Sequence, residues 1–330
     1  MSSWQVVADD RTGAYEVAGL LAGADGVVVA VGDRACEGVI DLGTRGLPPG
    51  DAAAVARRLP ATDWMGHKID STLRGNWAHE VRARRLETGR RVVVLPGWPD
   101  MGRTCVAGVV RMFDEPVGAM KDHLPEAALV PHVAALRHWW DTGRAVAVCD
   151  VPDTEAMLEI AAAVAQLPED ELIVAGPAGP LAAVWWARAG GRPAAPAAPA
   201  VESPALVVCG SANSMAHRQL AQLRMARPHV EVLAVQSAAT GVELEPGPAR
   251  ELAKQARARL DAGDIATLVL AGGDTAAAVL GDAPRRVGGM IAPGMPWSRD
   301  ADGGGPLVIT KAGGFGGVDA LARLFPGKTE

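Results

Sequence analysis

Short apolar runs alternate with longer amphipathic stretches along most of the chain. Residues 4–8, 91–96 and 205–210 are apolar runs of strand length. Residues 76–87 and 214–225 instead place Ala, Leu and Val at helical spacing among Arg, Gln and Glu. Continuously apolar strands separated by such helices are typical of parallel sheets covered on both faces. The pattern predicts an α/β protein.

One segment interrupts this alternation. Residues 190–204 alternate Pro with Ala and show no hydrophobic period, as expected of a semi-rigid linker. A long surface loop inside one domain is the alternative, but a new strand, loop and helix begin directly afterwards. Because 330 residues also suit two domains, we expect a domain over residues 1–190, a linker over 191–204 and a second domain over 205–330.

The composition excludes several classes of protein. Apolar residues make up 49% of the chain, and the net charge of −6 comes without a basic cluster of the kind that nucleic acids require. No apolar run approaches the roughly 20 residues of a membrane-spanning helix. The four cysteines form no CxxC pair, so neither zinc nor a disulfide framework is indicated. Because a strand begins almost at Met1, without a signal-peptide pattern, we expect a cytoplasmic protein.

Polar groups gather just after the strands of the first domain. Asp9 and Asp10 end the first strand and precede Thr12, which can cap a helix. Two carboxylates in this position could hold substrate hydroxyls, bind Mg²⁺ or accept a proton. Helix capping alone would also explain them.

A denser polar segment covers residues 68–76. Lys68 and Arg74 could clamp a carboxylate, and Asp70 could accept a proton from an attacking hydroxyl. An N-cap series with a surface arginine is the alternative, but the density of reactive groups favours a site. Residues 95–108 form a Pro/Gly-rich loop in which Arg103 is a second candidate anion clamp, and Arg45 is a third in the segment DLGTRG.

The second domain repeats one design three times. Residues 209–220, 268–280 and 309–321 each read as an apolar strand, a loop of small residues and a helix. Glycines let the backbone approach a ligand closely, and helix N-termini attract phosphate. None of the loops matches the Walker pattern GxxxxGK[ST] or the dinucleotide pattern GxGxxG. The repeat therefore indicates an anion site of another kind.

Taken in order, these segments resemble the four-carbon acid sugar kinase family. ADDRTGA, KIDSTLRG and PGWPDMGRT are similar to its substrate-side motifs, and GSANSMAHRQ, AGGDTAAAVL, PGMPWSR and TKAGGFGG resemble its nucleotide-domain loops. The resemblance extends from Val6 to about Leu324. It implies two three-layer α/β domains with mainly parallel sheets and an active-site crevice between them. It also implies an ATP-dependent kinase that uses Mg²⁺ to phosphorylate a terminal hydroxyl of a threonate, erythronate or 3-oxo-tetronate.

The motifs assign candidate roles to individual residues. The catalytic candidates are Asp10 and Asp70. The substrate-binding candidates are Asp9, Thr12, Arg45, Lys68, Ser71, Arg74 and Arg103. The nucleotide-binding candidates are Ser211, Asn213, Ser214, Gly272, Gly273, Asp274, Thr275, Gly313 and Gly314. No metal ligand is assigned.

The chain departs from the family pattern at several places. Arg11 stands where an aliphatic residue is usual, and Tyr15-Glu16 replaces a small residue followed by Asp. Ser214 stands where Pro is frequent, and Ala216 lacks a common hydroxyl. The exact sugar acid, the reacting hydroxyl and the base therefore stay open. Two alternatives also stay open: a Rossmann-type NAD-dependent oxidoreductase of a hydroxy acid, and a non-catalytic binding protein. A homodimer is allowed, but the sequence does not determine the oligomeric state.

Overall fold

The chain folds into two compact units. The computed structural model describes residues 3–32, 37–194, 197–211, 213–235 and 246–325. Unit 1 comprises residues 1–21 and 29–194, and unit 2 comprises residues 22–28 and 195–330. Within the expected linker, residues 195–196 lie outside the described part, and residues 197–202 form no helix or strand.

Unit 1 is built on a parallel sheet of the order β2-β3-β1-β4-β11-β5-β10-β9. Its strands are β1 (Trp4–Ala8), β2 (Val27–Val31), β3 (Gly38–Asp41), β4 (Trp64–Lys68), β5 (Arg91–Val94), β9 (Ala128–Val130), β10 (Val146–Cys149) and β11 (Leu172–Gly176). The expectation of an α/β fold with continuously buried strands is confirmed here, because β1, β4, β5 and β11 are buried along almost their whole length.

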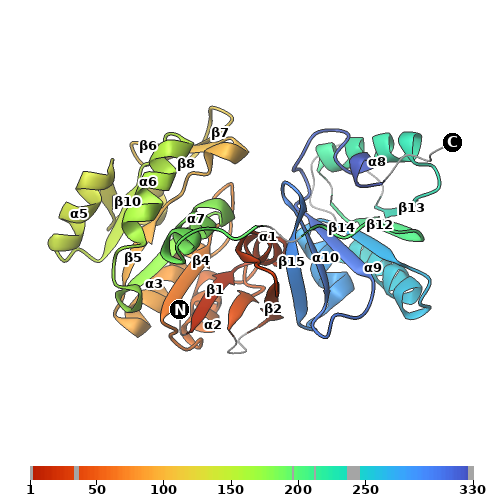
Figure 1. Cartoon of the computed structure of the whole chain (residues 1–330), viewed down its shortest axis with the longest axis horizontal. Helices are drawn as coiled ribbons and strands as arrows, with labels where there is room; N and C mark the ends of the chain where they lie inside the picture. Colours follow the sequence, from red (N-terminus) through yellow and green to blue (C-terminus); the bar gives the residue numbers. More distant parts are fainter. Residues whose placement is uncertain (1–2, 33–36, 195–196, 212, 236–245, 326–330) are drawn as a thin grey trace. The chain divides into compact units, whose positions relative to one another are not determined.

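Helices connect the strands of unit 1 (Figure 1). They are α1 (Arg11–Leu21), α2 (Pro49–Arg57), α3 (Trp77–Thr88), α4 (Met120–His123), α5 (Val133–Asp141), α6 (Thr154–Val164) and α7 (Ala178–Arg188). Trp77 and Val81 of α3 pack onto Met65, Val92 and Ile173 of the sheet in one apolar core. This core fixes α3 against β4 and so sets the position of the polar segment between them.

A small antiparallel sheet replaces part of the Pro/Gly-rich loop expected over residues 95–108. Strands β6 (Arg103–Val106), β7 (Val109–Met112) and β8 (Glu115–Ala119) pair in sequence order. Asp150, far away in the sequence, accepts hydrogen bonds from the N–H groups of Ala107 and Gly108 at the first turn. Because this anchor is tertiary, the local pattern could not reveal the hairpin.

Unit 2 contains a mixed sheet of the order β13-β12-β14-β17-β16-β15. Its elements are β12 (Ala205–Cys209), α8 (Ser214–Ala226), β13 (Glu231–Ala234), α9 (Pro246–Asp261), β14 (Thr267–Ala271), α10 (Gly273–Leu280), β15 (Arg285–Ala292), β16 (Met295–Asp300) and β17 (Leu307–Lys311). The pairs β13–β12, β12–β14 and β14–β17 are parallel, whereas β16 pairs antiparallel with both β17 and β15. The motif PGMPWSR forms the tip of the β15–β16 hairpin and most of β16.

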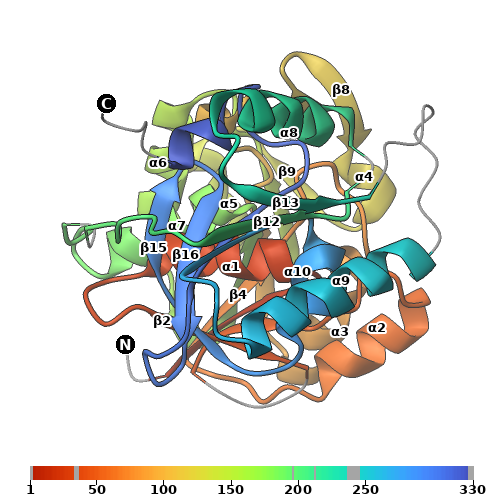
Figure 2. The same ribbon diagram turned by 90° about the vertical axis from the view of Figure 1, so that its right-hand side faces the viewer.

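Figure 2 shows α8 on one side of β12 and β13, with α9 on the other side. Val207 of β12 faces a core with Leu220 and Leu223 of α8. Its neighbour Val208 faces a second core with Leu252 of α9 and Val279 of α10. Successive side chains of a strand point to opposite faces, so the fully apolar strand predicts this three-layer arrangement.

Each unit has one strand at which the order of the strands across the sheet reverses. This strand is β1 in unit 1 and β12 in unit 2. In unit 1, β3 and β4 flank β1, and in unit 2, β13 and β14 flank β12. Ligands of open α/β sheets bind at the carboxyl ends of the strands at such switch points. No helix of the described residues is long and apolar enough to cross a membrane.

Candidate functional site

Arg45 connects three carboxylates at the carboxyl edge of the unit 1 sheet. Its guanidinium binds Asp9 with two hydrogen bonds of 3.0 and 2.8 Å, and lies 2.9 Å from Asp10 and 3.3 Å from Asp70. Burial would lower the pKa of Arg45, but the hydrogen bond with Asp9 and the charges of the three carboxylates raise it above its ordinary value. The predicted residues Asp9, Asp10, Arg45 and Asp70 therefore form one cluster, which we call the acid–arginine cluster.

Asp9 forms the buried side of the cluster, with a side chain only 1% exposed. Burial raises its pKa although Arg45 opposes the effect. A Cβ at Gly75 would collide with its Oδ2 atom, and Gly75 also has a φ of +85°. Asp9 therefore binds Arg45 and lies directly against the turn at Gly75.

Asp10 stands at the start of α1, where its Oδ1 accepts a hydrogen bond from the N–H of Gly13 (2.9 Å). Its Oδ2 accepts one from the hydroxyl of Thr12 (2.7 Å). A Cβ at Gly13 would lie 2.6 Å from Asp10 Oδ1 and 3.5 Å from Lys68 Nζ. Glycine at this position thus lets the helix backbone approach the reactive side chains, as expected of a binding site.

Asp70 follows β4 and accepts hydrogen bonds from the Thr72 N–H and hydroxyl at 2.8 and 2.6 Å. The guanidinium of Arg74 binds it at 3.2 and 3.1 Å. Burial would raise the pKa of Asp70, but the Arg74 hydrogen bonds, the charge of Arg45 and the Thr72 contact hold it well below the usual range. These contacts favour the ionised form of Asp70. Thr72 makes this contact, whereas the predicted Ser71 lies half-buried beside it.

Lys68 pairs with an acid that the sequence analysis did not select. Lys68 Nζ lies 3.7 Å from Glu16 of α1 and donates a 2.9 Å hydrogen bond to the Ile69 carbonyl. Burial raises the pKa of Glu16 although Lys68 opposes the effect. Two signals in the sequence could have selected Glu16. It departs from the family pattern, and it follows Thr12 by four residues, which places both side chains on one face of α1.

Arg103 at the start of β6 is almost fully buried and donates a 2.9 Å hydrogen bond to the Asp70 carbonyl. Its Nε and second terminal nitrogen have no hydrogen-bond partner among the described residues. Burial lowers its pKa to about 10. A buried guanidinium with free donors beside the acid–arginine cluster is suited to a ligand carboxylate.

Three strand ends of unit 2 meet, but the third segment lacks the expected helix: residues 312–321 form turns, and only a short 3₁₀ helix, Ala322–Leu324, follows them. The Gly210 N–H donates to the Thr275 hydroxyl (3.0 Å), and the Gly272 N–H donates to the Lys311 carbonyl (2.9 Å). These contacts tie the ends of β12, β14 and β17 together. Gly272 has a φ of +110°, a conformation that favours glycine, and Gly273, Asp274 and Thr275 open α10 behind it.

The loops after β12 and β17 lie directly against each other. A Cβ at Gly313 would lie 2.7 Å from the Ser211 hydroxyl, and one at Gly314 would lie 2.8 Å from the Asn213 side-chain nitrogen. Asn213 caps α8 by accepting hydrogen bonds from Met215 and Ala216, and Ser214 is the first helical residue. The glycines therefore let the loop after β17 pack closely against Ser211 and Asn213, beside the N-termini of α8 and α10, and helix N-termini are suited to the phosphates of a nucleotide.

A Mg²⁺ ion in this protein would be bound by few side chains and mainly by the phosphates of the nucleotide. The described residues contain no group of three His, Cys, Asp or Glu side chains that could hold a metal ion. Mg²⁺ is usually held by one or two carboxylates together with phosphate oxygens. Of the two acidic residues in the predicted phosphate segments, Asp274 is exposed in the first turn of α10, whereas Asp319 forms an ion pair with Arg323.

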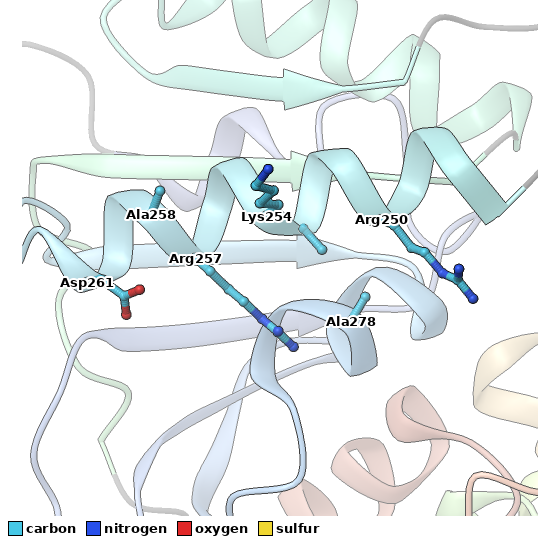
Figure 3. A pocket seen from close by; sticks show the side chains of 7 residues that line it. Arg250, Lys254, Arg257, Ala258, Asp261 and Ala278 are labelled. Atoms are coloured by element: carbon cyan, nitrogen blue, oxygen red, sulfur yellow. The ribbon is translucent and has the colours of Figure 1, made fainter.

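A groove of about 510 Å³ between α9 and α10 lies outside these clusters. Figure 3 shows Arg250, Lys254 and Arg257 along it, with Asp261 at one end and Ala278 on α10. The three basic side chains are exposed, and no predicted site residue lines the groove. It is an open, solvated surface between two helices.

Two domain families match the chain. The sugar-binding N-terminal domain matches residues 4–123, and the nucleotide-binding C-terminal domain matches residues 248–321. Two curated D-threonate kinases are similar over most of the chain. The protein from Bordetella bronchiseptica is 29% identical over 85% of this chain and 83% of its own length. The protein from Cupriavidus necator is 30% identical over 99% of this chain and 98% of its own length.

Solved structures share the fold. A Haemophilus influenzae protein superposes with a TM-score of 0.70 at 20% identity, covering 97% of this chain and 98% of its own. A Bordetella bronchiseptica protein, described as a domain-swapped dimer with bound citrate, gives 0.50 at 25% identity over 98% and 97%. Fold and matched domains define a sugar-acid kinase. The chain belongs to the four-carbon acid sugar kinase family.

Proposed function

We propose that the protein is an ATP-dependent kinase that phosphorylates a terminal hydroxyl of a short sugar acid of about four carbons, such as a threonate, an erythronate or a 3-oxo-tetronate. The meeting of the loops after β12, β14 and β17 carries the proposal, because their glycines allow close backbone packing beside the N-termini of α8 and α10. The D-threonate kinases among its relatives support the choice of acceptor.

The nucleotide would occupy unit 2. Ser211, Asn213 and Ser214 would face it from α8, residues 272–275 from α10, and Gly313 and Gly314 from the loop after β17. Mg²⁺, when bound with the phosphates, neutralises their negative charge and stabilises the transferring phosphoryl group. Catalysis in this reaction consists mainly of positioning and electrostatic stabilisation.

The sugar acid would occupy the acid–arginine cluster of unit 1. Arg103 has free donors and Arg74 has an exposed guanidinium, so these two side chains are suited to the substrate carboxylate. Lys68, Ser71 and Thr12 would contact hydroxyls. Asp10 would accept the proton of the attacking hydroxyl, because its ties are fewer than those of Asp70, which the arginines hold as an anion.

The domain assignment follows from these roles. We propose that residues 1–190 bind the sugar acid, that residues 191–204 link the domains and that residues 205–330 bind the nucleotide. A homodimer is consistent with the description of the Bordetella relative as a domain-swapped dimer. The cytoplasmic setting agrees with Cys105, Cys149 and Cys209, which are free and buried.

The test is ATP consumption with a panel of three- to six-carbon sugar acids. We expect turnover that depends on Mg²⁺ and is highest with one four-carbon acid. Binding of NAD(H) without binding of ATP would favour the oxidoreductase alternative. Binding of ATP and of a sugar acid without turnover across the panel would instead establish the non-catalytic binding protein.

A further inference from the structure

Two buried side chains of unit 2 donate hydrogen bonds to the backbone of the glycine-rich loop after β17. Gln219 of α8 and Lys311 at the end of β17 are both 0% exposed. Neither side chain takes part in the contacts that join the three strand ends. Both instead bind the backbone of residues 312–317.

Their hydrogen bonds go to carbonyl groups of the loop alone. Lys311 Nζ donates to the carbonyls of Ala312 and Gly313 at 3.0 and 2.9 Å. The Gln219 amide nitrogen reaches the carbonyls of residues 315, 316 and 317 at 2.9, 3.1 and 2.9 Å. Five of the six carbonyl groups from residue 312 to residue 317 therefore turn toward the protein interior.

This orientation decides where the N–H groups point. In a trans peptide the carbonyl and the following N–H point in opposite directions. The N–H groups of Gly313, Gly314, Gly316 and Gly317 thus point away from Gln219 and Lys311, and within the described residues no protein acceptor binds them. Successive N–H groups that point outward form a concave anion site.

We propose that Gln219 and Lys311 are positioning residues of the nucleotide site, which orient the loop so that the N–H groups of its glycines bind the phosphate oxygens of a nucleoside triphosphate. The inference rests on the proposed kinase function and deepens it. It names the polyphosphate as the group that this loop recognises and the two side chains that prepare the loop. If the two side chains only stabilised the fold, their loss would change the KM for ATP and the KM for the sugar acid to the same extent.

The experiment measures tripolyphosphate and ATP binding to the full chain by calorimetry, together with KM for ATP and for the sugar acid. In Gln219→Leu or Lys311→Met the freed carbonyls can rotate outward, and unmade hydrogen bonds of this kind weaken binding roughly 10- to 100-fold. We expect both dissociation constants and the KM for ATP to rise by this factor, while the KM for the sugar acid stays unchanged. Gln255→Leu, at an exposed glutamine of α9, is the matched control.

Gly314→Ala tests the same loop and leaves Gln219 and Lys311 in place. The added Cβ would lie 2.8 Å from the Asn213 side chain, so the loop would have to shift. It should weaken tripolyphosphate binding, whereas Gly50→Ala in α2, where the Cβ meets no atom within 4 Å, should not. Unchanged binding in the folded Gln219, Lys311 and Gly314 variants, with normal binding by the unaltered protein, overturns this inference alone. If the unaltered protein binds neither ligand, the proposed function falls and the inference with it.

Discussion

Asp10 and Asp70 are chemically identical side chains that their surroundings make different. Asp70 is held by Arg45, Arg74 and Thr72, and its pKa lies well below the usual range. Asp10 has the Thr12 hydroxyl, the Gly13 N–H and a single arginine contact. The sequence marks both as catalytic candidates, and the different roles that we propose for them rest on these partners.

Replacing each acid by its amide should therefore give different kinetics. Asp10→Asn should lower kcat by about 100-fold or more, which is typical for the loss of a general base. Asp70→Asn should mainly raise the KM for the sugar acid, because it releases Arg74 and Arg45. Asp51→Asn, at an exposed position of α2, should change neither constant. A larger loss of kcat in Asp70→Asn than in Asp10→Asn would reverse the assignment.

Lys311 should leave a pH signature on stability. Burial lowers its pKa from the ordinary value of 10.5 to about 8. Between these pH values the unfolded chain binds more protons at this group than the folded chain, so the free energy of unfolding should rise with pH, by roughly 3 kcal/mol at most. Urea unfolding from pH 7 to pH 10 should show this rise in the unaltered protein relative to Lys311→Met. Parallel curves for the two proteins would contradict the prediction.

The loop that carries Arg45 owes its position to α3. Glu80 of α3 accepts a hydrogen bond from Thr44 and lies 3.1 Å from His67 of β4. The Asn76 amide donates to the carbonyls of Thr44 and Leu47, both at 2.8 Å. Arg11, the unusual residue in the family pattern, binds Asp41 at the start of the same loop. These buried contacts hold the Arg45 loop before any ligand arrives.

Asn76→Ala should loosen that loop. The carbonyls of Thr44 and Leu47 would lose the Asn76 donor, at a cost of about 1 to 3 kcal/mol in the free energy of unfolding. We expect the KM for the sugar acid to rise and the KM for ATP to stay constant, because the Arg45 loop belongs to unit 1. Thermal unfolding and steady-state kinetics measure both effects. Glu87→Ala, exposed on the same helix, is the control, and equal changes in the two variants would count against this role.

The β6–β8 hairpin should likewise depend on Asp150. In the unaltered protein the N–H groups of Ala107 and Gly108 each bind one carboxylate oxygen of Asp150. The Asp150→Asn variant keeps only one acceptor oxygen for these two N–H groups. Hydrogen exchange of residues 103–119 should become faster in Asp150→Asn, with the rest of unit 1 unchanged. Because Arg103 begins this hairpin, the KM for the sugar acid should rise as well. Unaltered exchange would show that the hairpin is held by its apolar contacts.

At the scale of the whole molecule, the two proposed ligands should protect different parts of the chain. A ligand at 100 times its dissociation constant stabilises the folded state by about 2.7 kcal/mol. In hydrogen exchange, ATP should protect the amides of residues 205–325, and the sugar acid should protect those of residues 3–119. Protection of the first range by the sugar acid alone would reverse the proposed domain roles. Adenosine, which lacks phosphates, should protect far less than ATP.

The sequence by itself determined the α/β class, the order of most elements and the residue types of both clusters. Apolar strands flanked by amphipathic helices require burial on both faces, and parallel strands bring the polar residues after β1, β3 and β4 to one edge. The glycine loops of unit 2 were predicted for the same reason, since close backbone approach requires the absence of a Cβ.

Only the tertiary structure decided which of these groups act on one another. Glu16 meets Lys68, and Asp150 holds the β6–β8 hairpin, because residues distant in sequence pack side by side. Gln219 lies 96 residues before Phe315 and yet donates a hydrogen bond to its carbonyl. Local pattern carries burial and backbone preference, whereas hydrogen-bond partners and pKa shifts depend on neighbours that the chain supplies only after folding.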